Sequence, residues 1–367
     1  MAKIALVHDH LTQEGGAEKV LRTLHDVFPQ SPIYTLVYDK KKMNDDMKEK
    51  QVNPSFLQKL PLGIRKYQWF LLWMPAATEN YDLSNFDTVI SSSSAFAKGI
   101  ITKPNTKHIC YCHTPTRYLW TDSQTYVENL KQNRLIKKFL PLALSKLRMW
   151  DKLAADRVDL FIANSNTVRK RIKKYYGQDS LVIYPPVETS KFYINNTPKN
   201  YFLTGGRLVP YKRFDLTVTA FNRLNMPLKI FGTGPDYSRL KKMAKKNVEF
   251  LGNVTDAKKA ELYASCQAFI NPQEEDFGIT AVEAMASGRP VIAYQAGGAL
   301  DTIIDAQTGL FFKEQNWEDL AYQILHFKKF HFDSEQIRNH ALQFDTEQFK
   351  KKIKEVIKQD NYFISSR

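Results

Sequence analysis

The sequence predicts an α/β fold made of two similar halves, each a parallel sheet covered by helices. Short apolar runs of strand length alternate with segments that repeat apolar residues at helical spacing, which is the pattern of parallel strands joined by crossover helices. The same rhythm restarts after a double proline at positions 185 and 186. A length of 367 residues also suits two domains, at roughly 150 residues for each.

In the first half, a strand is expected at Lys3 to Val7, followed by a loop and by a helix over Ala17 to Val27. Further strands are expected at Ile33–Val37, Thr88–Ser91, His108–Cys112 and Asp159–Asn164. The pattern does not indicate the order of these strands in the sheet.

In the second half, strands are expected at Tyr201–Thr204, Leu228–Phe231, Ala268–Asn271 and Val291–Tyr294. After Gly309 the chain is expected to be mostly helical, ending in a lysine-rich amphipathic segment from Gln348 to Gln359. We therefore expect one domain over residues 1–185, a second over 186–345, and a helical segment over 346–367 that packs back on the first domain.

Composition indicates a globular protein. Hydrophobic residues make up 43% and charged residues 25% of the sequence, which excludes disordered, collagenous and disulfide-stapled classes. The three cysteines have no partners at zinc spacing, so reduced thiols and a cytoplasmic location are expected. The N-terminus does not have the pattern of a signal peptide, and the longest apolar run, Trp69 to Ala77, is too short to span a bilayer.

The charge balance indicates an anionic partner. Lysine and arginine number 53 against 38 aspartate and glutamate residues, a formal charge of +15. Nucleic acid, an anionic membrane surface and a phosphorylated small molecule all fit this excess, so the motifs must distinguish between them.

Each half has one candidate anion-binding motif directly after its first strand. Both motifs lie at the carboxyl ends of strands, where such folds bind ligands. Gly15 and Gly16 open a helix, so backbone amides there can approach a phosphate, although a plain helix start is the alternative. Gly206 precedes Arg207, and Lys212 follows five residues later, so two cations can converge on a diphosphate. Solvated surface cations are the alternative for that pair.

Two further motifs follow later strands of the second half. Gly232 and Gly234 lie in a turn that can border a base or a phosphate, with a plain turn as the alternative. Glu275 lies in a loop, and Glu283 lies about one turn into a helix expected over Ile279 to Ser287, whose N-terminus favours an anion. The eight-residue spacing means little alone, so the surrounding loop, helix and strand carry the prediction.

These motifs together resemble a known family. The run Glu275-x-Phe277-Gly278-x4-Glu283-Ala284-Met285-Ala286-x-Gly288-x-Pro290 is similar to the signature of the retaining GT-B glycosyltransferases of family 4, which also carries the N-terminal glycine pair and the arginine and lysine described above. A resemblance to bacterial surface-polysaccharide enzymes, many of them mannosyltransferases, rests on Asp82-Leu83, Ser91–Ser94, Ala97–Gly99 and Cys112-His113-Thr114-Pro115-x-Arg117-Tyr118-x-Trp120. Together the two resemblances span both halves of the chain.

The resemblance implies the GT-B fold, with two Rossmann-like domains facing across a cleft: an acceptor-binding domain over residues 1–185 and a nucleotide-sugar-binding domain over residues 186–345. It implies that Arg207 and Lys212 hold the donor diphosphate and that Glu283 holds the ribose. Glu275 would contact hydroxyls of the transferred sugar, and His113 would lie near the reacting carbon. The remaining donor-binding residues would be Gly15, Gly16, Gly206, Gly232, Gly234, Phe277, Gly278, Ile279 and Thr280. Asp301 departs from the family, which more often has glutamate after the preceding glycine pair.

The expected mechanism follows from the charge that develops on the leaving oxygen of a nucleoside diphosphate. Arg207, Lys212 and the helix end at Ile279 are placed to supply cations and amides for it. The paired-aspartate motif of metal-dependent transferases is missing from the sequence, so we expect transfer without a metal or other cofactor. Retention of configuration, by departure and attack on the same sugar face, is implied by the resemblance alone.

The acceptor is expected to be a glycan or a lipid-linked oligosaccharide in surface-polysaccharide synthesis. Basic amphipathic segments at 56–74 and 131–140 suggest peripheral contact with the inner face of the cell membrane. The cations that carry this hypothesis are Lys59, Arg65, Lys66, Lys131, Arg134, Lys137 and Lys138. Helices that pack on the sheet and leave their lysines in solvent are the alternative.

The sequence therefore predicts a glycosyltransferase, with mannose from GDP-mannose as the donor that the subgroup resemblance implies. A UDP-sugar donor and a GT-B nucleotide-sugar epimerase are the enzyme alternatives. A basic nucleic-acid-binding protein is the non-enzyme alternative, and the sequence contains no zinc, RNA-recognition or zipper motif that would favour it. A dehydrogenase ranks last because the dinucleotide fingerprint is missing after the first strand.

Overall fold

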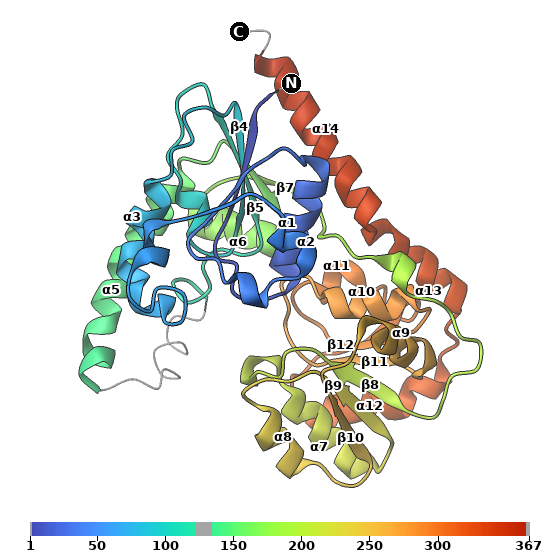
Figure 1. Ribbon diagram of the computed structural model, residues 1–367. Coiled ribbons are helices and arrows are strands. Elements are labelled where there is room, and N and C mark those ends of the chain that lie inside the picture. The colour runs from blue at the N-terminus through green and yellow to red at the C-terminus, as the bar shows by residue number, and fades with distance from the viewer. Residues whose placement is uncertain (1, 122–133, 365–367) are drawn as a thin grey trace. The chain divides into compact units, whose positions relative to one another are not determined.

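The computed structural model describes residues 2–121 and 134–364 (Figure 1). The chain divides into two compact units, one formed by residues 1–184 with 350–367 and the other by residues 185–349. Each unit contains one parallel sheet with helices around it. The predicted α/β fold with two Rossmann-like halves is confirmed.

The first unit is built on seven parallel strands. They are β1 (Ile4–His8), β2 (Ile33–Thr35), β3 (Val52–Pro54), β4 (Thr88–Ser93), β5 (Lys107–Cys112), β6 (Leu160–Ala163) and β7 (Ser180–Val182). Their order is β3-β2-β1-β4-β5-β6-β7, so β1 lies between β2 and β4. The direction of chain progression reverses there, and such a switch point is where doubly wound sheets bind ligands.

Helices cover the sheet of the first unit because their apolar positions repeat at helical spacing. They are α1 (Gly16–Val27), α2 (Asp45–Lys48), α3 (Met74–Glu79), α5 (Arg134–Ala155) and α6 (Asn166–Tyr176), with 3-10 turns at η1 (Lys40–Lys42), η2 (Phe56–Lys59), η3 (Tyr67–Trp73) and η4 (Ala97–Gly99). The central strand β4 is buried along its whole length and ends in three serines. Their hydroxyls therefore need hydrogen-bond partners inside the protein.

The second unit repeats the plan with six parallel strands. They are β8 (Phe202–Gly205), β9 (Leu228–Phe231), β10 (Val248–Gly252), β11 (Phe269–Asn271), β12 (Val291–Tyr294) and β13 (Gly309–Phe312), in the order β10-β9-β8-β11-β12-β13. The switch point lies between β8 and β11. The site residues predicted in this half follow β8, β9 and β11, at or beside that point.

The helices of the second unit are α7 (Phe214–Leu224), α8 (Tyr237–Met243), α9 (Asp256–Ser265), α10 (Ile279–Ala286), α11 (Ala299–Thr302), α12 (Trp317–His326) and α13 (Ser334–Ala341), with 3-10 turns at η5 (Thr189–Lys191), η6 (Pro210–Lys212), η7 (Phe327–Lys329) and η8 (Leu342–Phe344). The last helix, α14 (Thr346–Ile364), runs from this unit into the first. The amphipathic character predicted for this segment is confirmed, since Phe349, Ile353 and Ile357 are buried.

Four strands were not expected from the sequence, namely β3, β7, β10 and β13. All four are sheet-edge strands, and the first three carry half-buried or exposed residues instead of a continuous apolar run. The expectation of mostly helical chain after Gly309 is wrong for β13. An ideal Cβ on Gly309 would lie 2.1 Å from the Val291 carbonyl oxygen, so this glycine marks the close approach of two strands.

Candidate active site

Two glycine loops lie against each other at the carboxyl ends of β8 and β9. The Gly206 amide donates to the Phe231 carbonyl at 3.1 Å, and the Leu208 amide donates to the Thr233 carbonyl at 2.9 Å. Gly232 has φ of +100°, and an ideal Cβ there would lie 1.9 Å from the Gly206 carbonyl oxygen. Close backbone packing therefore requires glycine at this position, whatever further role the loop has. Gly234 is in the same situation, since an ideal Cβ there would lie 2.2 Å from the Leu208 carbonyl oxygen.

Lys212 and Glu275, predicted for the donor diphosphate and sugar, lie together. Lys212 ends the turn η6 after β8, Glu275 follows β11, and the Lys212 Nζ lies 2.8 Å from the Glu275 Oε1. Their side chains are only 15% and 20% exposed. Burial disfavours the charged ammonium, but the neighbouring carboxylate outweighs it, so the pKa of Lys212 lies above its ordinary value. Arg207, from the same loop as Lys212, is exposed.

The loop from Glu275 to Gly278 sits on the glycine pair that precedes α11. The Gly298 amide donates to the Glu275 carbonyl at 2.8 Å, and an ideal Cβ on Gly297 would lie 2.3 Å from that same oxygen. Phe277 is buried in this loop. Gly278 is the N-cap of α10 with φ of +94° and has no side chain to cap the helix. The amide end of α10 thus begins at Ile279 and Thr280, as the sequence predicted.

Glu283 lies one turn into α10 and is held by two residues of α9. Its Oε1 accepts from Lys259 Nζ at 3.0 Å, and its Oε2 accepts from the Tyr263 hydroxyl at 3.2 Å. Glu283 is only 3% exposed. The sequence analysis did not single out Lys259 and Tyr263, although their spacing of four residues places both on one helix face.

In the first unit, His113 follows β5 and is 9% exposed. Its Nε2 lies 2.8 Å from the Ser92 Oγ at the end of β4. Burial, with a smaller contribution from nearby His8, lowers the pKa of His113 to about 4. The imidazole is therefore neutral at neutral pH, in a position to accept or donate one hydrogen bond at each nitrogen.

The hydrogen bond to His113 continues into a longer buried chain that the sequence analysis missed. His8 pairs with Ser92 in the register of β1 and β4, and its Nδ1 lies 3.1 Å from the Ser92 Oγ. On its other side, the His8 Nε2 lies 3.8 Å from the Glu18 Oε1 on α1. This arrangement depends on β1, β4 and β5 being neighbours, which the sequence pattern does not indicate.

Gly15 is the N-cap of α1, and Gly16 begins that helix. An ideal Cβ on Gly15 would lie 3.0 Å from the Glu18 Oε2. The buried Glu18 carboxylate thus lies close to the helix end that was predicted to approach a phosphate. Burial raises the pKa of Glu18, but the contact with His8 outweighs it, so that the pKa lies below its ordinary value.

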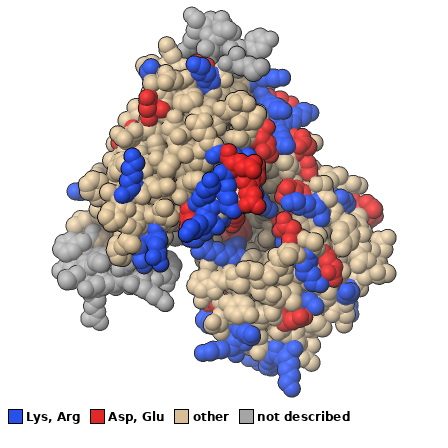
Figure 2. All heavy atoms as spheres, in the orientation of Figure 1, with Lys and Arg blue, Asp and Glu red and all other residues tan. Residues whose placement is uncertain are grey.

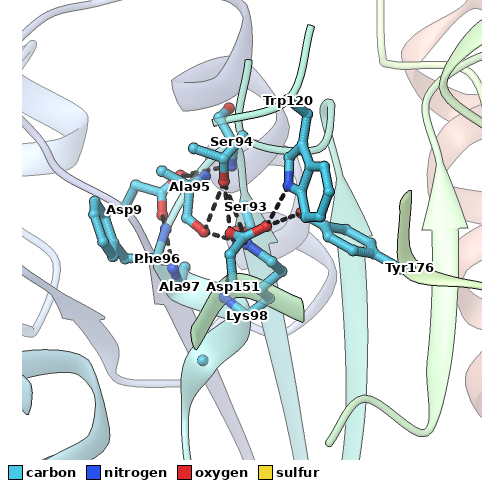
Figure 3. Close-up of polar contacts among 12 residues, drawn as sticks. Asp9, Ser93, Ser94, Ala95, Phe96, Ala97, Lys98, Trp120, Asp151 and Tyr176 are labelled. Atoms are coloured by element: carbon cyan, nitrogen blue, oxygen red, sulfur yellow. Dashed lines mark hydrogen bonds and ion pairs between the residues drawn. The ribbon is translucent and has the colours of Figure 1, made fainter. Parts of the chain in front are cut away.

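Asp9, the residue after β1, fixes the loop that follows β4 (Figure 3). Its carboxylate accepts from the amides of Ser94, Ala95, Phe96 and Ala97 at 2.6, 2.9, 2.8 and 2.7 Å. Burial raises the pKa of this carboxyl, but His8 and the backbone amides more than compensate, and the pKa lies below its ordinary value. The loop beside Ser92 is therefore held by four charge-assisted hydrogen bonds.

The same loop is anchored on its other side by a buried ion pair (Figure 3). Lys98 Nζ lies 2.5 Å from the Asp151 Oδ1, and both residues are 1% exposed. Asp151 also accepts 2.8 Å hydrogen bonds from Thr116, Trp120 and Tyr176. Lys98 belongs to one of the subgroup motifs, and its charge is neutralised inside the unit instead of facing a ligand.

One of the two predicted membrane segments lies within the described residues. Trp69, Leu72 and Trp73 are 65%, 58% and 61% exposed around η3, and Lys66 lies 5.6 Å from the ring centre of Trp69. In the second segment, residues 131–133 and the side chains of 134–139 lie outside the described part of the chain. In the view of Figure 2, lysines and arginines form separate groups, several of them beside acidic residues.

Residues 2–121 and 134–364 contain no helix with the length and apolarity needed to cross a membrane. The same residues contain no group of three or more histidine, cysteine, aspartate or glutamate side chains arranged to hold a metal ion.

Comparison with known protein families gives two adjoining matches. Residues 14–191 match the model described as Glycosyltransferase Family 4, and residues 188–344 match the model described as Glycosyl transferases group 1. Together the two matches extend over nearly the whole described chain.

Similar individual proteins match over shorter stretches. A GDP-mannose-dependent alpha-mannosyltransferase from Mycolicibacterium smegmatis is 39% identical over 31% of this chain and 30% of its own. An O-antigen chain mannosyltransferase from Escherichia coli is 29% identical over 46% of this chain and 48% of its own. The matched segments thus span about half or less of these relatives.

Among solved structures, Anabaena HepE in complex with UDP is similar in fold. It has a TM-score of 0.72 and 18% sequence identity, and the match covers 97% of this chain and 100% of that one.

Proposed function

The chain belongs to family 4 of the GT-B glycosyltransferases, and from that premise we propose that it transfers mannose from GDP-mannose, with retention of configuration, to a glycan or lipid-linked oligosaccharide in surface-polysaccharide synthesis. The names of two similar proteins support the donor, since one is a GDP-mannose-dependent mannosyltransferase and the other an O-antigen mannosyltransferase. The observation that carries the proposal is the pair of Lys212 and Glu275 beside the amide end of α10.

The leaving diphosphate is stabilised by protein groups in this proposal. Lys212 stays charged because Glu275 raises its pKa, and Arg207 is exposed on the same loop. The amides of Ile279 and Thr280 add the positive end of α10. Fixed cations and amides of this kind act where charge develops in the transition state, so they provide for transfer without a metal.

The two glutamates bind hydroxyl groups by exchanging partners. Each one is paired with a lysine in the unliganded protein, Glu275 with Lys212 and Glu283 with Lys259. An incoming diphosphate attracts Lys212 and leaves Glu275 free to accept from sugar hydroxyls. Glu283 offers its second oxygen to the ribose in place of the Tyr263 hydroxyl, while Lys259 keeps the carboxylate charged.

Nucleotide-dependent thermal stability tests the donor. Purified protein is heated with GDP, UDP or NAD, each with EDTA, and a bound ligand at 100 times its Kd adds about 2.7 kcal/mol of stability. We expect GDP to stabilise, the variant Lys212→Met to lose the effect, and Lys258→Met to keep it. Lys258 is the matched control because it lies 2.8 Å from Glu261 in an exposed pair outside the site. Stabilisation by UDP alone would refute the GDP donor, and stabilisation by NAD alone would refute the transferase.

A UDP-sugar donor is the second candidate, because the HepE structure of similar fold contains UDP. An epimerase is distinguished from both transferases by the need for an acceptor. Incubation with radiolabelled GDP-mannose and crude lipid-linked acceptor is expected to give labelled glycan, with no epimerised nucleotide sugar when acceptor is omitted.

The exposed apolar surface at η3, formed by Trp69, Leu72 and Trp73, is proposed to contact an anionic membrane that carries the acceptor. Lys59, Arg65 and Lys66 are exposed beside it, and each cation near such a surface contributes about 1 kcal/mol. Flotation with phosphatidylglycerol vesicles is expected to recover wild-type protein and to lose Trp69→Ala/Trp73→Ala. Tyr322→Ala, which removes a 55% exposed aromatic in the second unit, is the control. Equal recovery of both variants would contradict membrane contact.

A further inference from the structure

Four buried polar groups in the first unit form a continuous chain that ends at His113. Glu18 Oε1 lies 3.8 Å from His8 Nε2, His8 Nδ1 lies 3.1 Å from Ser92 Oγ, and Ser92 Oγ lies 2.8 Å from His113 Nε2. None of the four residues is more than 9% exposed. The hydrogen-bond partners of these four groups are therefore other protein groups. The position of the proton in one hydrogen bond thus determines which atom can donate in the next one.

The Ser92 hydroxyl couples the two histidines because it has a single proton. It can donate to one imidazole nitrogen and must then accept from the other, so His8 Nδ1 and His113 Nε2 cannot both be without a proton while both hydrogen bonds persist. Two arrangements of the chain satisfy every group. They differ in the direction of all the hydrogen bonds between His8 and His113.

We propose that His8 is a positioning residue whose protonation state sets the tautomer of His113 through Ser92. Doubly protonated His8 donates from Nδ1 to Ser92, whose hydroxyl then donates to His113 Nε2, so that the His113 proton resides on Nδ1. Neutral His8 keeps its proton on Nε2, which faces Glu18, and its bare Nδ1 accepts a hydrogen bond from the Ser92 hydroxyl. The Ser92 oxygen then accepts a hydrogen bond from the Nε2–H group of His113. The His113 nitrogen that is not bound to Ser92 is a donor in the first state and an acceptor in the second.

The consequence for catalysis rests on the proposed function and on the position near the reacting carbon that the family resemblance implies for His113. A donor at Nδ1 can hydrogen-bond a sugar or phosphate oxygen, whereas a bare Nδ1 can accept from a hydroxyl group. A proton held several ångströms away on His8 would thus decide which of these contacts His113 makes. His113 itself stays neutral throughout, in keeping with its pKa of about 4.

The groups that surround His8 act on its proton in opposite directions. Glu18 on α1 and the adjacent Asp9 favour the imidazolium form, and both carboxyls have pKa values held low partly by His8. His10 from the same segment and His113 from β5 oppose it when they are protonated. Replacing Glu18 by glutamine removes the nearest carboxylate and therefore disfavours the imidazolium form of His8.

The test is 15N NMR of the full-length protein with labelled histidine, which distinguishes protonated from bare ring nitrogens. The eight histidines are assigned by single substitutions such as His113→Gln and His8→Gln. As the pH is lowered and His8 takes up a second proton, the protonated and bare nitrogens of His113 are expected to exchange places. In Glu18→Gln the exchange is expected at a lower pH than in the wild type, because the carboxylate that favours the imidazolium form of His8 has been removed.

Two serine variants separate the chain from general effects of mutation. Ser92→Ala is expected to abolish the exchange at His113. Ser91→Ala is the matched control, because Ser91 lies on the same strand and its Oγ lies 2.8 Å from the Nε2 of another buried histidine, His108. It should leave His113 unchanged. If Ser92→Ala does not fold, the shift in Glu18→Gln provides the test.

A single His113 tautomer at every pH between 5 and 9, or an exchange that persists in Ser92→Ala, would overturn the inference. These readouts need no substrate, so they are independent of the proposed function. An exchange seen by NMR in a protein that transfers no sugar would refute the proposed function alone. Loss of the exchange in an active transferase would refute the coupling alone.

Discussion

Replacing Lys98 by methionine is expected to destabilise the first unit by about 3–5 kcal/mol, the cost of leaving a buried charge without its partner. Asp151 is 1% exposed and would keep only the neutral donors Thr116, Trp120 and Tyr176. Asp151→Asn should cost a similar amount, because the buried Lys98 ammonium would retain the Ala95 carbonyl but lose its carboxylate.

The double variant is the more informative measurement. Lys98→Met/Asp151→Asn removes both charges, so neither is left unpaired, and its loss of stability should be several kcal/mol smaller than the sum of the two single losses. The control is the exposed ion pair between Lys152, which follows Asp151 on α5, and Asp156, which follows the end of that helix. Its side chains are 40% and 45% exposed, and Lys152→Met should change stability by no more than about 1 kcal/mol.

Denaturation in guanidinium chloride followed by tryptophan fluorescence is suited to this test. Four of the five tryptophans lie in the first unit, and one of them, Trp120, donates directly to Asp151. The fluorescence transition therefore reports mainly on the unit that contains the ion pair. A Lys98→Met variant within 1 kcal/mol of wild type, or strictly additive single losses, would refute the reasoning about uncompensated charge.

Three further predictions concern the site and its surroundings. Lys212→Met should lower kcat by about 100- to 1000-fold in a sugar-transfer assay, because it removes a fixed cation from the leaving group; an unchanged rate would exclude that role. Glu283→Gln should weaken GDP binding measured by calorimetry. Lys259→Met should weaken it less, because Lys259 is expected to affect GDP only through its contact with Glu283. If Lys259→Met weakened GDP binding more than Glu283→Gln does, Lys259 would have to contact the ligand directly. Burial lowers the pKa of His108 to about 3 and that of His113 to about 4 from an ordinary value of 6.5, so unfolded chains take up protons first on acidification. The stability that depends on keeping these two histidines neutral should be fully present above pH 6.5. Below pH 6.5 it should fall by about 1.4 kcal/mol per pH unit for each histidine, until the folded-state pKa of about 4 for His113 or about 3 for His108 is reached. His108→Gln should reduce the slope measured by urea denaturation.

The alternation of strands and helices could be predicted from the sequence where a strand is buried on both faces. The bounds of β9 and β12 match the expected ranges because both strands are nearly continuous apolar runs in the middle of a sheet. The edge strands β3 and β7 have three residues each and half-exposed side chains, so they leave no comparable pattern. β13 was not predicted because its first residue is Gly309, and a glycine in a sequence usually indicates the end of a strand or helix. In the structure, this glycine allows close approach to the neighbouring strand.

The same division applies to the site. Lys212, Glu275 and α10 could be placed together because each follows a strand end within a short, family-typical segment. His8, Ser92 and His113 come from three segments about 84 and 21 residues apart, and only the strand order β1-β4-β5 makes them neighbours. A local pattern does not contain that order. His113 could therefore be predicted as a site residue only by resemblance. Ser92 and His8, which determine on which ring nitrogen His113 carries its proton, could not be predicted.

The serine-rich end of β4 shows how a buried strand can be both structural and chemical. An apolar residue at any of its last three positions would satisfy burial, but each serine here has a polar neighbour: Ser91 meets His108, Ser92 meets His8 and His113, and the Ser93 hydroxyl accepts from the Lys98 amide. A single missing partner would leave a buried polar group unsatisfied, at a cost of about 1–3 kcal/mol. His8 and His113 are thus fixed by the same hydrogen bonds that satisfy the buried serine hydroxyls at the end of β4. It follows that variants at Ser92 should change the hydrogen bonds of His8 and His113 together, whereas variants at Ser91 should affect stability alone.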